Sequence, residues 1–267
     1  MLTKKKHEDL LKKGLRRGDF PKYLFKYREI GEFTKDIIIN SQFYFASPNT
    51  FNDPFDCNLS FKKYYRDRDI KEYKEKLIKR NPYVEIKKLD NLFGKKNENF
   101  IRVRQEAIDD MIKISGVFSL SKTYESITMW SHYSKNHEGL VFELDVEQDY
   151  DFFNMFGFVK YKKKYEELSF CKGRKKSLRK LILTKYVDWK YEKEIRIIDF
   201  NKSGVRKFNN KLISTILFGY KSKKEDIKNI IKLCQDNGFE HVKFKKAKLI
   251  PGKFSLDFYI IKKDDFL

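Results

Sequence analysis

The sequence contains few cysteine and histidine residues. Its three cysteines among 267 residues, Cys57, Cys171 and Cys234, lie far apart and form no C-x-x-C pair. Neither a disulfide framework nor a zinc site is therefore indicated. The four histidines argue against a His-rich metal site. We expect no metal and a reducing cytoplasm as the location.

Long apolar runs are also absent, so we expect no transmembrane helix, which would need about 18 apolar residues or more. The first 20 residues are charged and lack the apolar core of a signal peptide. They are expected to form a basic N-terminal helix or tail. The spacing of Leu10, Leu11 and Leu15 suits a membrane surface or, as we favour, a short helix docked on its own domain.

Several catalytic motifs are missing from the chain. There is no G-x-x-x-x-G-K-[ST], no G-x-G-x-x-G, no H-E-x-x-H and no G-x-S-x-G. A P-loop NTPase is therefore not expected. Glu72 and Lys74 form an E-x-K pair of the kind found in some nucleases, but lysine is too common here for the match to carry weight.

Positive charge is abundant. Lys and Arg number 59 against 38 acidic residues, which gives a net charge of +21. Such a field attracts polyanions, and nucleic acid is the first candidate partner. The alternative is the lysine-rich composition of an AT-rich genome. The basic run around Lys172, Arg174, Lys175, Lys176 and Arg179 is the expected nucleic-acid contact.

Segments typical of strands and helices alternate without a regular βαβ pattern, which predicts an α+β fold. No Pro/Gly/Ser-rich linker divides the chain, so residues 21–267 are predicted to form one domain with a central mixed or split sheet. A charged, Lys/Glu-rich helical insertion is expected over about 66–114.

Three segments combine polar and aromatic residues. In "LFKYR", Lys26 and Arg28 share one face of a predicted strand and could hold a phosphate or a carboxylate. In "MWSHY", His132 and Tyr133 lie on one helical face with Met129, which suits a core stripe or a site. "FNDPFD" follows a buried strand and brings three polar residues that suit a structural turn: Asn52, Asp53 and Asp56.

A fourth segment, "WKYEKEIRI", is predicted to be a strand. Glu192, Glu194 and Arg196 occupy every second position and should share one face. Ile195 and Ile197 should then face a core. An ordinary ion pair on an exposed sheet is one interpretation, and a functional site is the other.

Taken together, "LFKYR", "FYFASPNTFNDPFD", "FSLSKTYESITMWSHYSKNHEGLVFELD", "KYVDWKYEKEIRI" and "ILFGYKSKKEDIKNII" resemble a bacterial family of unknown function, DUF2971. The resemblance runs from about Tyr23 to Ile260 and does not by itself imply an activity.

The order of elements also resembles ADP-ribosyltransferases that modify DNA or RNA. That resemblance implies NAD as the substrate, with Glu194 as the catalytic carboxylate and Glu192 serving the acceptor. The sequence departs from the pattern of those enzymes because it lacks a clean His or Ser-Thr-Ser motif. The residues implied to hold NAD are Tyr27, Arg28, Ser119, Trp130, His132 and Tyr133.

Three functions of different kinds remain. The first is an NAD-dependent ADP-ribosyltransferase, acting as a toxin or a phage-defence effector on nucleic acid or protein. The second is a non-catalytic nucleic-acid-binding or defence-accessory protein on the same fold. The third, a nuclease, is disfavoured because no acidic metal cluster is apparent. A cavity that joins Arg28, Tyr133 and Glu194 would favour the first.

Overall fold

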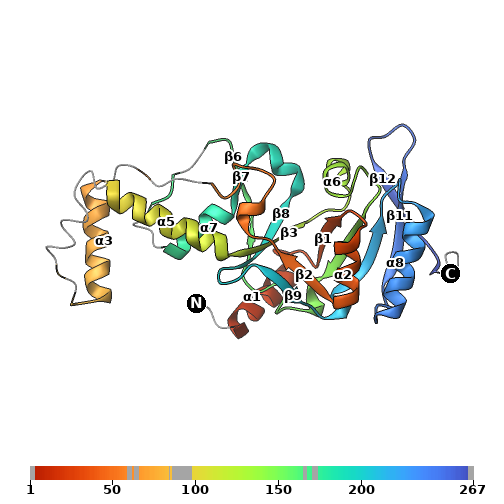
Figure 1. Ribbon diagram of the computed structural model, residues 1–267, viewed down its shortest axis with the longest axis horizontal. Coiled ribbons are helices and arrows are strands. Elements are labelled where there is room, and N and C mark those ends of the chain that lie inside the picture. The colour runs from red at the N-terminus through yellow and green to blue at the C-terminus, as the bar shows by residue number, and fades with distance from the viewer. Residues whose placement is uncertain are drawn as a thin grey trace.

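The computed structural model describes residues 4–58, 62, 66–83, 85, 98–164, 167–169 and 174–263. An eight-stranded mixed sheet forms its centre, which confirms the α+β class (Figure 1). All its neighbouring strands are antiparallel except β10 and β11. Across the sheet the strands are β12 (Leu256–Ile260), β11 (Lys243–Leu249), β10 (Ile213–Phe218), β4 (Leu140–Asp145), β1 (Tyr23–Arg28), β3 (Gly116–Ser121), β8 (Glu194–Asp199) and β5 (Phe156–Phe158).

Short strands form two small sheets beside the main one. β2 (Gln42–Phe45) pairs with β9 (Gly204–Lys207), and β6 (Lys160–Lys162) pairs with β7 (Thr184–Tyr186). Several short 3-10 helices connect these elements: η1 (Pro48–Thr50), η2 (Val146–Gln148), η4 (Val187–Glu192) and η5 (Asn210–Leu212).

Helices cover the sheet and extend beyond it. α2 (Glu32–Asn40) and α8 (Lys224–Asp236) contact each other, whereas α3 (Asp67–Arg80) lies farthest from the sheet, with α5 (Glu98–Ile114) leading back to it (Figure 1). The parts of the predicted insertion at 84 and 86–97 lie outside the described residues. The α-helices are α1 (Lys4–Arg17), α2 (Glu32–Asn40), α3 (Asp67–Arg80), α5 (Glu98–Ile114), α6 (Ile127–Tyr133), α7 (Arg174–Ile182) and α8 (Lys224–Asp236).

One face of the sheet is apolar. Phe118 and Leu120 of β3 and Ile195 and Ile197 of β8 alternate with polar residues and are buried in the largest apolar cluster. Leu11 of α1 is also fully buried there, so the N-terminal helix is docked on the domain, as predicted. Burial of large apolar side chains is the dominant favourable contribution to such a fold.

The other face carries a smaller aromatic cluster. Trp130 of α6 packs edge-on against Tyr27 of β1, with the ring centroids 5.4 Å apart. The indole N–H of Trp130 donates to the carbonyl of Tyr124 at 2.6 Å. This cluster fixes α6 above the middle of the sheet, and the polar residues described below lie beside it.

The helix α6, which carries "MWSHY", is short. It ends at Tyr133, and the chain then turns through Lys135, Asn136 and His137, all with positive φ. Gly139 follows because a Cβ there would lie only 2.2 Å from the carbonyl oxygen of Arg28. The glycine is thus required by the close approach of β1 rather than by a helix cap.

A candidate active site in a split of the sheet

The sheet is split between β1 and β3. β1 pairs with β4 along its whole length, but with β3 only at Phe25 and Ser121. The side chain of Lys26 reaches across this gap, where its Nζ donates to the backbone carbonyl of Ser119 at 2.9 Å. A lysine ammonium therefore satisfies a carbonyl that a regular ladder would have paired.

A cavity of about 120 Å³ opens beside the split. Its walls come from β1, β3, α6, β7, η4, β8 and the segment after η1, which are far apart in the sequence. The residues that line it are Phe25, Lys26, Tyr27, Phe51, Asn52, Asp56, Ser119, Leu120, Ser121, Met129, Tyr133, Lys185, Glu192, Glu194 and Arg196.

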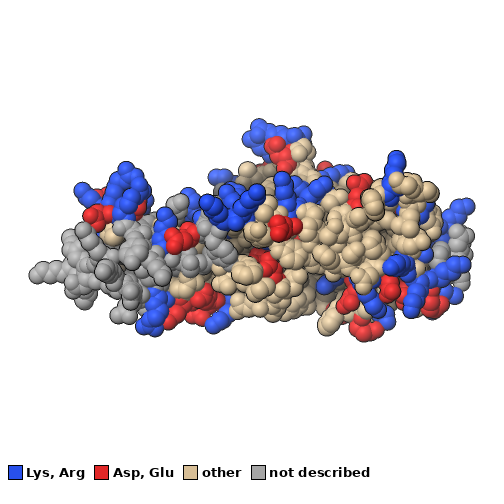
Figure 2. Space-filling view, turned by 90° about the horizontal axis from the view of Figure 1, so that it is seen from above, with Lys and Arg blue, Asp and Glu red and all other residues tan. Residues whose placement is uncertain are grey.

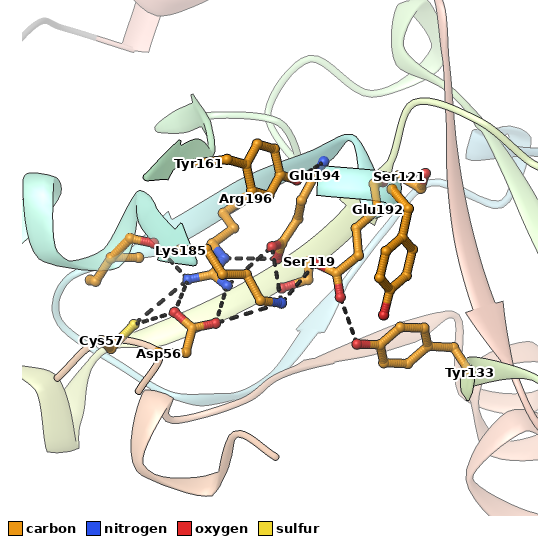
Figure 3. A network of polar contacts seen from close by, with 12 residues as sticks. Asp56, Cys57, Ser119, Ser121, Tyr133, Tyr161, Lys185, Glu192, Glu194 and Arg196 are labelled. Carbon is orange, nitrogen blue, oxygen red and sulfur yellow. Dashed lines mark hydrogen bonds and ion pairs between the residues drawn. The ribbon is translucent and has the colours of Figure 1, made fainter. Parts of the chain in front are cut away.

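Arg196 is the centre of a buried network of charges (Figure 3). Its guanidinium bonds Glu194 through two nitrogens, at 2.7 Å and 3.1 Å. It also bonds both carboxylate oxygens of Asp56 and the carbonyl of Ile182. Two bidentate carboxylate contacts hold the planar guanidinium firmly. Arg196 is only 1% exposed, so this charge lies almost entirely out of contact with solvent.

Lys185 connects this network to Glu192. Its ammonium lies 2.7 Å from Glu192, 3.6 Å from Glu194 and 3.8 Å from Asp56. It also lies over the ring of Trp189, 4.6 Å from the centroid. One lysine therefore contacts all three carboxylates of the site.

The placement of Glu192 corrects the prediction of one strand with three alternating charges. β8 begins at Glu194, and Glu192 ends the 3-10 helix η4. Lys193 between them is left-handed, with φ 46°, and turns the chain from the helix into the strand. Glu192 nevertheless faces the cavity because Lys185 and the hydroxyl of Tyr133 donate to its two carboxylate oxygens, at 2.7 Å and 2.6 Å.

The environment separates the two glutamates electrostatically. Burial alone would raise the pKa of Glu194, but the charges of Arg196 and Lys185 outweigh it and lower this pKa to about 2. Burial and the nearby Glu194 charge raise the pKa of Glu192, and Lys185 and Tyr133 only partly oppose that rise. Glu194 is thus a permanently charged partner of Arg196, whereas Glu192 is the carboxyl whose proton is easier to move.

Lys26 is the third cation of the site. Burial, and next the charge of Arg28, lower the pKa of Lys26 to about 7. The charges of Glu194 and Glu192 oppose this shift. A lysine with this pKa can exist in both protonation states near neutral pH.

Of the residues predicted to form the site, five line the cavity: Tyr27, Ser119, Tyr133, Glu192 and Glu194. Arg28 does not, although its charge acts on Lys26. The Nε of Arg28 is buried and has no hydrogen-bond partner in the part of the chain that the structure describes.

Two predicted aromatic contacts are placed elsewhere. Trp130 is fully buried in the aromatic cluster, so its ring offers no surface for stacking on a ligand. His132 is exposed outside the cavity lining, where its Nδ1 lies 3.0 Å from the hydroxyl of Tyr191.

The predicted basic run lies on and before α7. Lys176 and Arg179 are exposed, and Arg179 donates to the carbonyl of Phe156 at 2.7 Å. Arg174 and Lys175 belong to α7, and Lys172 lies outside the described residues.

Three residues of the site were not among those expected to bind NAD or to act in catalysis: Lys26, Asp56 and Lys185. Lys26 was visible as a cation beside Arg28 on the first strand. Asp56 stood in "FNDPFD", for which a structural turn was favoured, and the turn exists, since Asp53 accepts from the backbone N–H of Phe55 at 2.9 Å. Nothing distinguished Lys185 within a chain of 59 Lys and Arg residues.

Among the described residues, no group of three or more His, Cys, Asp and Glu could hold a metal ion. In the same part of the chain, no helix is long and apolar enough to cross a membrane.

Residues 129–197 match the family model described as "Protein of unknown function (DUF2971)". The matched segment runs from α6 to β8 and contains Tyr133, Lys185, Glu192, Glu194 and Arg196. No curated protein and no solved structure matches the chain.

Proposed function

This chain belongs to the DUF2971 family through residues 129–197, and we propose that it cleaves the nicotinamide–ribose bond of NAD and transfers the ADP-ribosyl group to an acceptor. Glu192 is the carboxylate that faces the ribose in this proposal. An enzyme of this kind would suit a toxin or a phage-defence effector.

One observation carries the proposal: residues from the first strand, the middle segment and the late strand meet in one cavity. Lys26, Ser119, Tyr133 and Glu194 come from β1, β3, α6 and β8 and line the same 120 Å³ space. These are the segments that resemble ADP-ribosyltransferases in the sequence. The meeting of such distant segments at a polar cavity supports a site rather than an ordinary sheet surface.

The cavity limits what part of NAD it could hold. Small-molecule pockets usually measure about 300–1,000 Å³, and this one measures about 120 Å³. It suits the nicotinamide ring with the edge of its ribose, whereas the rest of the dinucleotide would lie outside. Arg28 is not in the lining, so the proposal assigns it no contact with the diphosphate.

The two glutamates have different roles in this account. Both oxygens of Glu194 bond Arg196, at 2.7 Å and 3.1 Å, so its charge is already compensated. Glu192 receives one bond from Lys185 and one from Tyr133, and no guanidinium of the described residues contacts it directly. Glu192 is therefore the carboxylate better able to stabilise positive charge that develops on a substrate.

Lys185 and Tyr133 hold Glu192 in place, so that its carboxylate can face the positive charge that develops on the substrate. Cleavage of the bond to nicotinamide builds positive charge on the ribose carbon, and a carboxylate nearby stabilises it. The donors on Glu192 fix its orientation before the reaction, so little reorganisation is required. The same carboxylate can then take a proton from the acceptor.

A nicotinamide-release assay tests the proposal. Wild-type protein is incubated with NAD in the presence of RNA, DNA or cell extract, and Glu192→Gln is compared with the exposed control Glu225→Gln. We expect release from wild type and from the control, and a loss of about 10²-fold or more in Glu192→Gln. No release from wild type under any of these conditions would contradict the proposal.

A second function has some support from charge. The chain carries +21, and Lys176 and Arg179 are exposed on α7. Figure 2 shows Lys and Arg in several groups with Asp and Glu between them, rather than one continuous basic surface. If nucleic acid is the partner, affinity for RNA or DNA should fall steeply as the salt concentration rises. The reason is that Lys and Arg side chains displace counterions condensed on the phosphate backbone. Fluorescence anisotropy at increasing salt would test this, and binding that is indifferent to salt would contradict it.

A further inference from the structure

The amine of Lys26 is a nucleophile of the cavity beside the split that the proposed reaction does not use. Lys26 lines that cavity and keeps part of its surface exposed. Lys185 and Arg196 of the same lining are both paired with carboxylates. Lys26 makes no ion pair with any residue that the structure describes, and its Nζ donates instead to the backbone carbonyl of Ser119 at 2.9 Å. Its hydrogen-bond partner is therefore neutral.

Arg28 places an uncompensated positive charge near Lys26. The two residues are two positions apart on β1 and share a face of the strand, with about 7 Å between their Cα atoms. The guanidinium of Arg28 makes no ion pair, and its Nε no hydrogen bond, with the described residues. Burial and a like charge both disfavour the charged form of a lysine. Burial, and next the charge of Arg28, lower the pKa of Lys26 to about 7, against the opposing charges of Glu194 and Glu192.

At neutral pH a large share of Lys26 is therefore an uncharged amine. A pKa of about 7 leaves roughly half of the amine unprotonated at pH 7, whereas an exposed lysine with a pKa near 10.4 has about one in 2,500 unprotonated. A lysine that is desolvated or placed beside another cation is the kind that attacks carbonyl carbons and forms Schiff bases. Lys26 meets both conditions, and it lies in the wall of a cavity rather than in the packed core.

We propose that Lys26 captures a small uncharged aldehyde or ketone in this cavity as an imine. The lone pair of Nζ attacks the carbonyl carbon, and the oxygen takes the proton that the nitrogen gives up, which yields a carbinolamine. Glu192 of the same lining then donates a proton to the hydroxyl, which leaves as water while a C=N bond forms. The nitrogen returns its remaining proton to Glu192, so the net change is the loss of one water. The raised pKa of Glu192 suits this carboxyl to hold the proton.

The size and charge of the cavity define the class of carbonyl compound. Its volume of about 120 Å³ suits a molecule of few heavy atoms, since ordinary ligand pockets measure about 300–1,000 Å³. The lining carries no surplus positive charge when the amine is neutral, because Asp56, Glu192 and Glu194 face only Lys185 and Arg196 among the described residues. An uncharged aldehyde or ketone is therefore favoured over a 2-oxo acid, whose carboxylate needs a cation of its own. Apolar side chains of the lining would contact its carbon chain: Phe25, Phe51, Leu120 and Met129.

Reductive trapping of the whole chain with butanal tests the proposal. Sodium cyanoborohydride reduces an imine to a secondary amine, and peptide mapping by mass spectrometry then compares the label on Lys26 with the label on the exposed Lys243. With one equivalent of butanal at pH 7, we expect at least about tenfold more label on Lys26, since a far larger share of its amine is neutral. Equal labelling of the two lysines at pH 7, or less label on Lys26, would overturn the proposal.

The pH dependence separates a nucleophilic amine from one that is merely accessible. The ratio of label on Lys26 to label on Lys243 should fall as pH rises from 7 to 10, because exposed lysines lose protons there and Lys26 loses its own near pH 7. Glyoxylate, an anionic aldehyde, should give a smaller ratio at pH 7 than butanal does. A ratio that rises with pH would overturn the role of Lys26 as a neutral nucleophile. A larger ratio with glyoxylate would overturn the uncharged class of ligand.

Arg28→Gln tests the cause of the neutral amine without altering the lysine. Removing the neighbouring charge should raise the pKa of Lys26 and lower the labelling ratio at pH 7 by about threefold or more. The matched control Arg68→Gln removes an exposed guanidinium on α3, far from the sheet, and should be labelled as wild type is (Figure 1). A ratio in Arg28→Gln as high as in wild type would overturn the role of Arg28. The mapping and the pH series need only the wild-type chain, so they decide the proposal even where a variant does not fold.

The imine and the cleavage of NAD are decided separately. Imine formation goes beyond the proposed function and does not rest on it, although both use the same cavity. Nicotinamide release without selective labelling of Lys26 would overturn only the imine. Selective labelling without nicotinamide release would overturn only the cleavage of NAD.

Discussion

The two faces of β8 have opposite chemistry although they alternate along six residues. Ile195 and Ile197 are fully buried in the largest apolar cluster. Glu194 and Arg196 are buried almost as completely, at 6% and 1% exposure, on the other face. From Glu194 to Ile197 the strand therefore buries two hydrocarbon side chains on one side and an ion pair on the other.

This difference shows two ways of filling the interior. The apolar face gains free energy simply by leaving water, and its neighbours can adjust to many shapes. The charged face gains only if every group finds its partner, since buried charges lose their hydration. Its partners Asp56 and Lys185 come from separate parts of the chain, so this face depends on the whole fold. Such an expensive arrangement is more easily explained by function than by stability.

The largest effect should come from removing the shared cation. Arg196→Leu leaves Asp56 and Glu194 buried with Lys185 as their remaining close cation among the described residues. We expect the free energy of unfolding to fall by about 3–5 kcal/mol. Urea denaturation measures it. A loss below about 1 kcal/mol would show that the network contributes little and that the charged face tolerates an apolar side chain.

The matched change on the apolar face is Ile197→Ala. It leaves a cavity in the fully packed cluster, and the expected loss is about 2–4 kcal/mol. The pH dependence should separate the two variants. The lowered pKa of Glu194, from 4.5 to about 2, gives wild type stability that is present above pH 4.5 and is lost as pH falls toward 2. Ile197→Ala should keep this acid dependence and Arg196→Leu should lose most of it in urea titrations between pH 2 and 6.

A substitution of Lys26 should raise the free energy of unfolding rather than lower it. Its pKa falls from 10.5 in the unfolded chain to about 7 in the fold, so the unfolded state binds more protons between these values. Wild-type stability should therefore rise as pH increases from about 7 to 10.5. Lys26→Met removes this buried charge and should stabilise the protein at pH 7 by about 1–3 kcal/mol. Thermal unfolding at pH 7 and pH 10 would test it, and a destabilised variant at pH 7 would contradict the assigned burial cost.

The smallest effect is expected at an exposed ion pair in the same sheet. Lys248 of β11 and Asp257 of β12 lie 3.0 Å apart, and both side chains are more than half exposed. Removing the pair with Lys248→Ala should change stability by less than about 1 kcal/mol, because water and salt screen it. Urea denaturation at low and high salt provides the comparison with Arg196→Leu. A loss as large as that of Arg196→Leu would mean that burial is not what distinguishes the central network.

The apolar face and most of the sheet could be predicted from the sequence. Alternation in "LFKYR", "GVFSLS" and "LISTILF" reflects side chains that point to opposite faces of a strand, and these segments are β1, β3 and β10. The docking of Leu11 could also be predicted, since its neighbours repeat at helical spacing.

The charged site could be predicted only in part. Glu194 and Arg196 were identified by their spacing within one strand. Glu192 was placed on that strand wrongly, because nothing in "WKYEKEIRI" indicates the left-handed turn at Lys193. Asp56 joins the site through contacts with Arg196, 140 positions away in the sequence, and with Lys185. No local sequence pattern reports such tertiary contacts. Local patterns therefore gave the strand, and only the fold gave the site.

The central claim is that Glu192 serves the reaction and Glu194 serves the network. The most direct measurement compares Glu192→Gln with Glu194→Gln for both nicotinamide release and the free energy of unfolding. We expect Glu192→Gln to lose about 10²-fold or more of the release rate but to lose less stability than Glu194→Gln, since its single amide oxygen can still accept from Lys185. We expect Glu194→Gln to lose stability, because it weakens a buried pair with Arg196. A stable Glu194→Gln protein without activity, together with an active Glu192→Gln protein, would contradict the account.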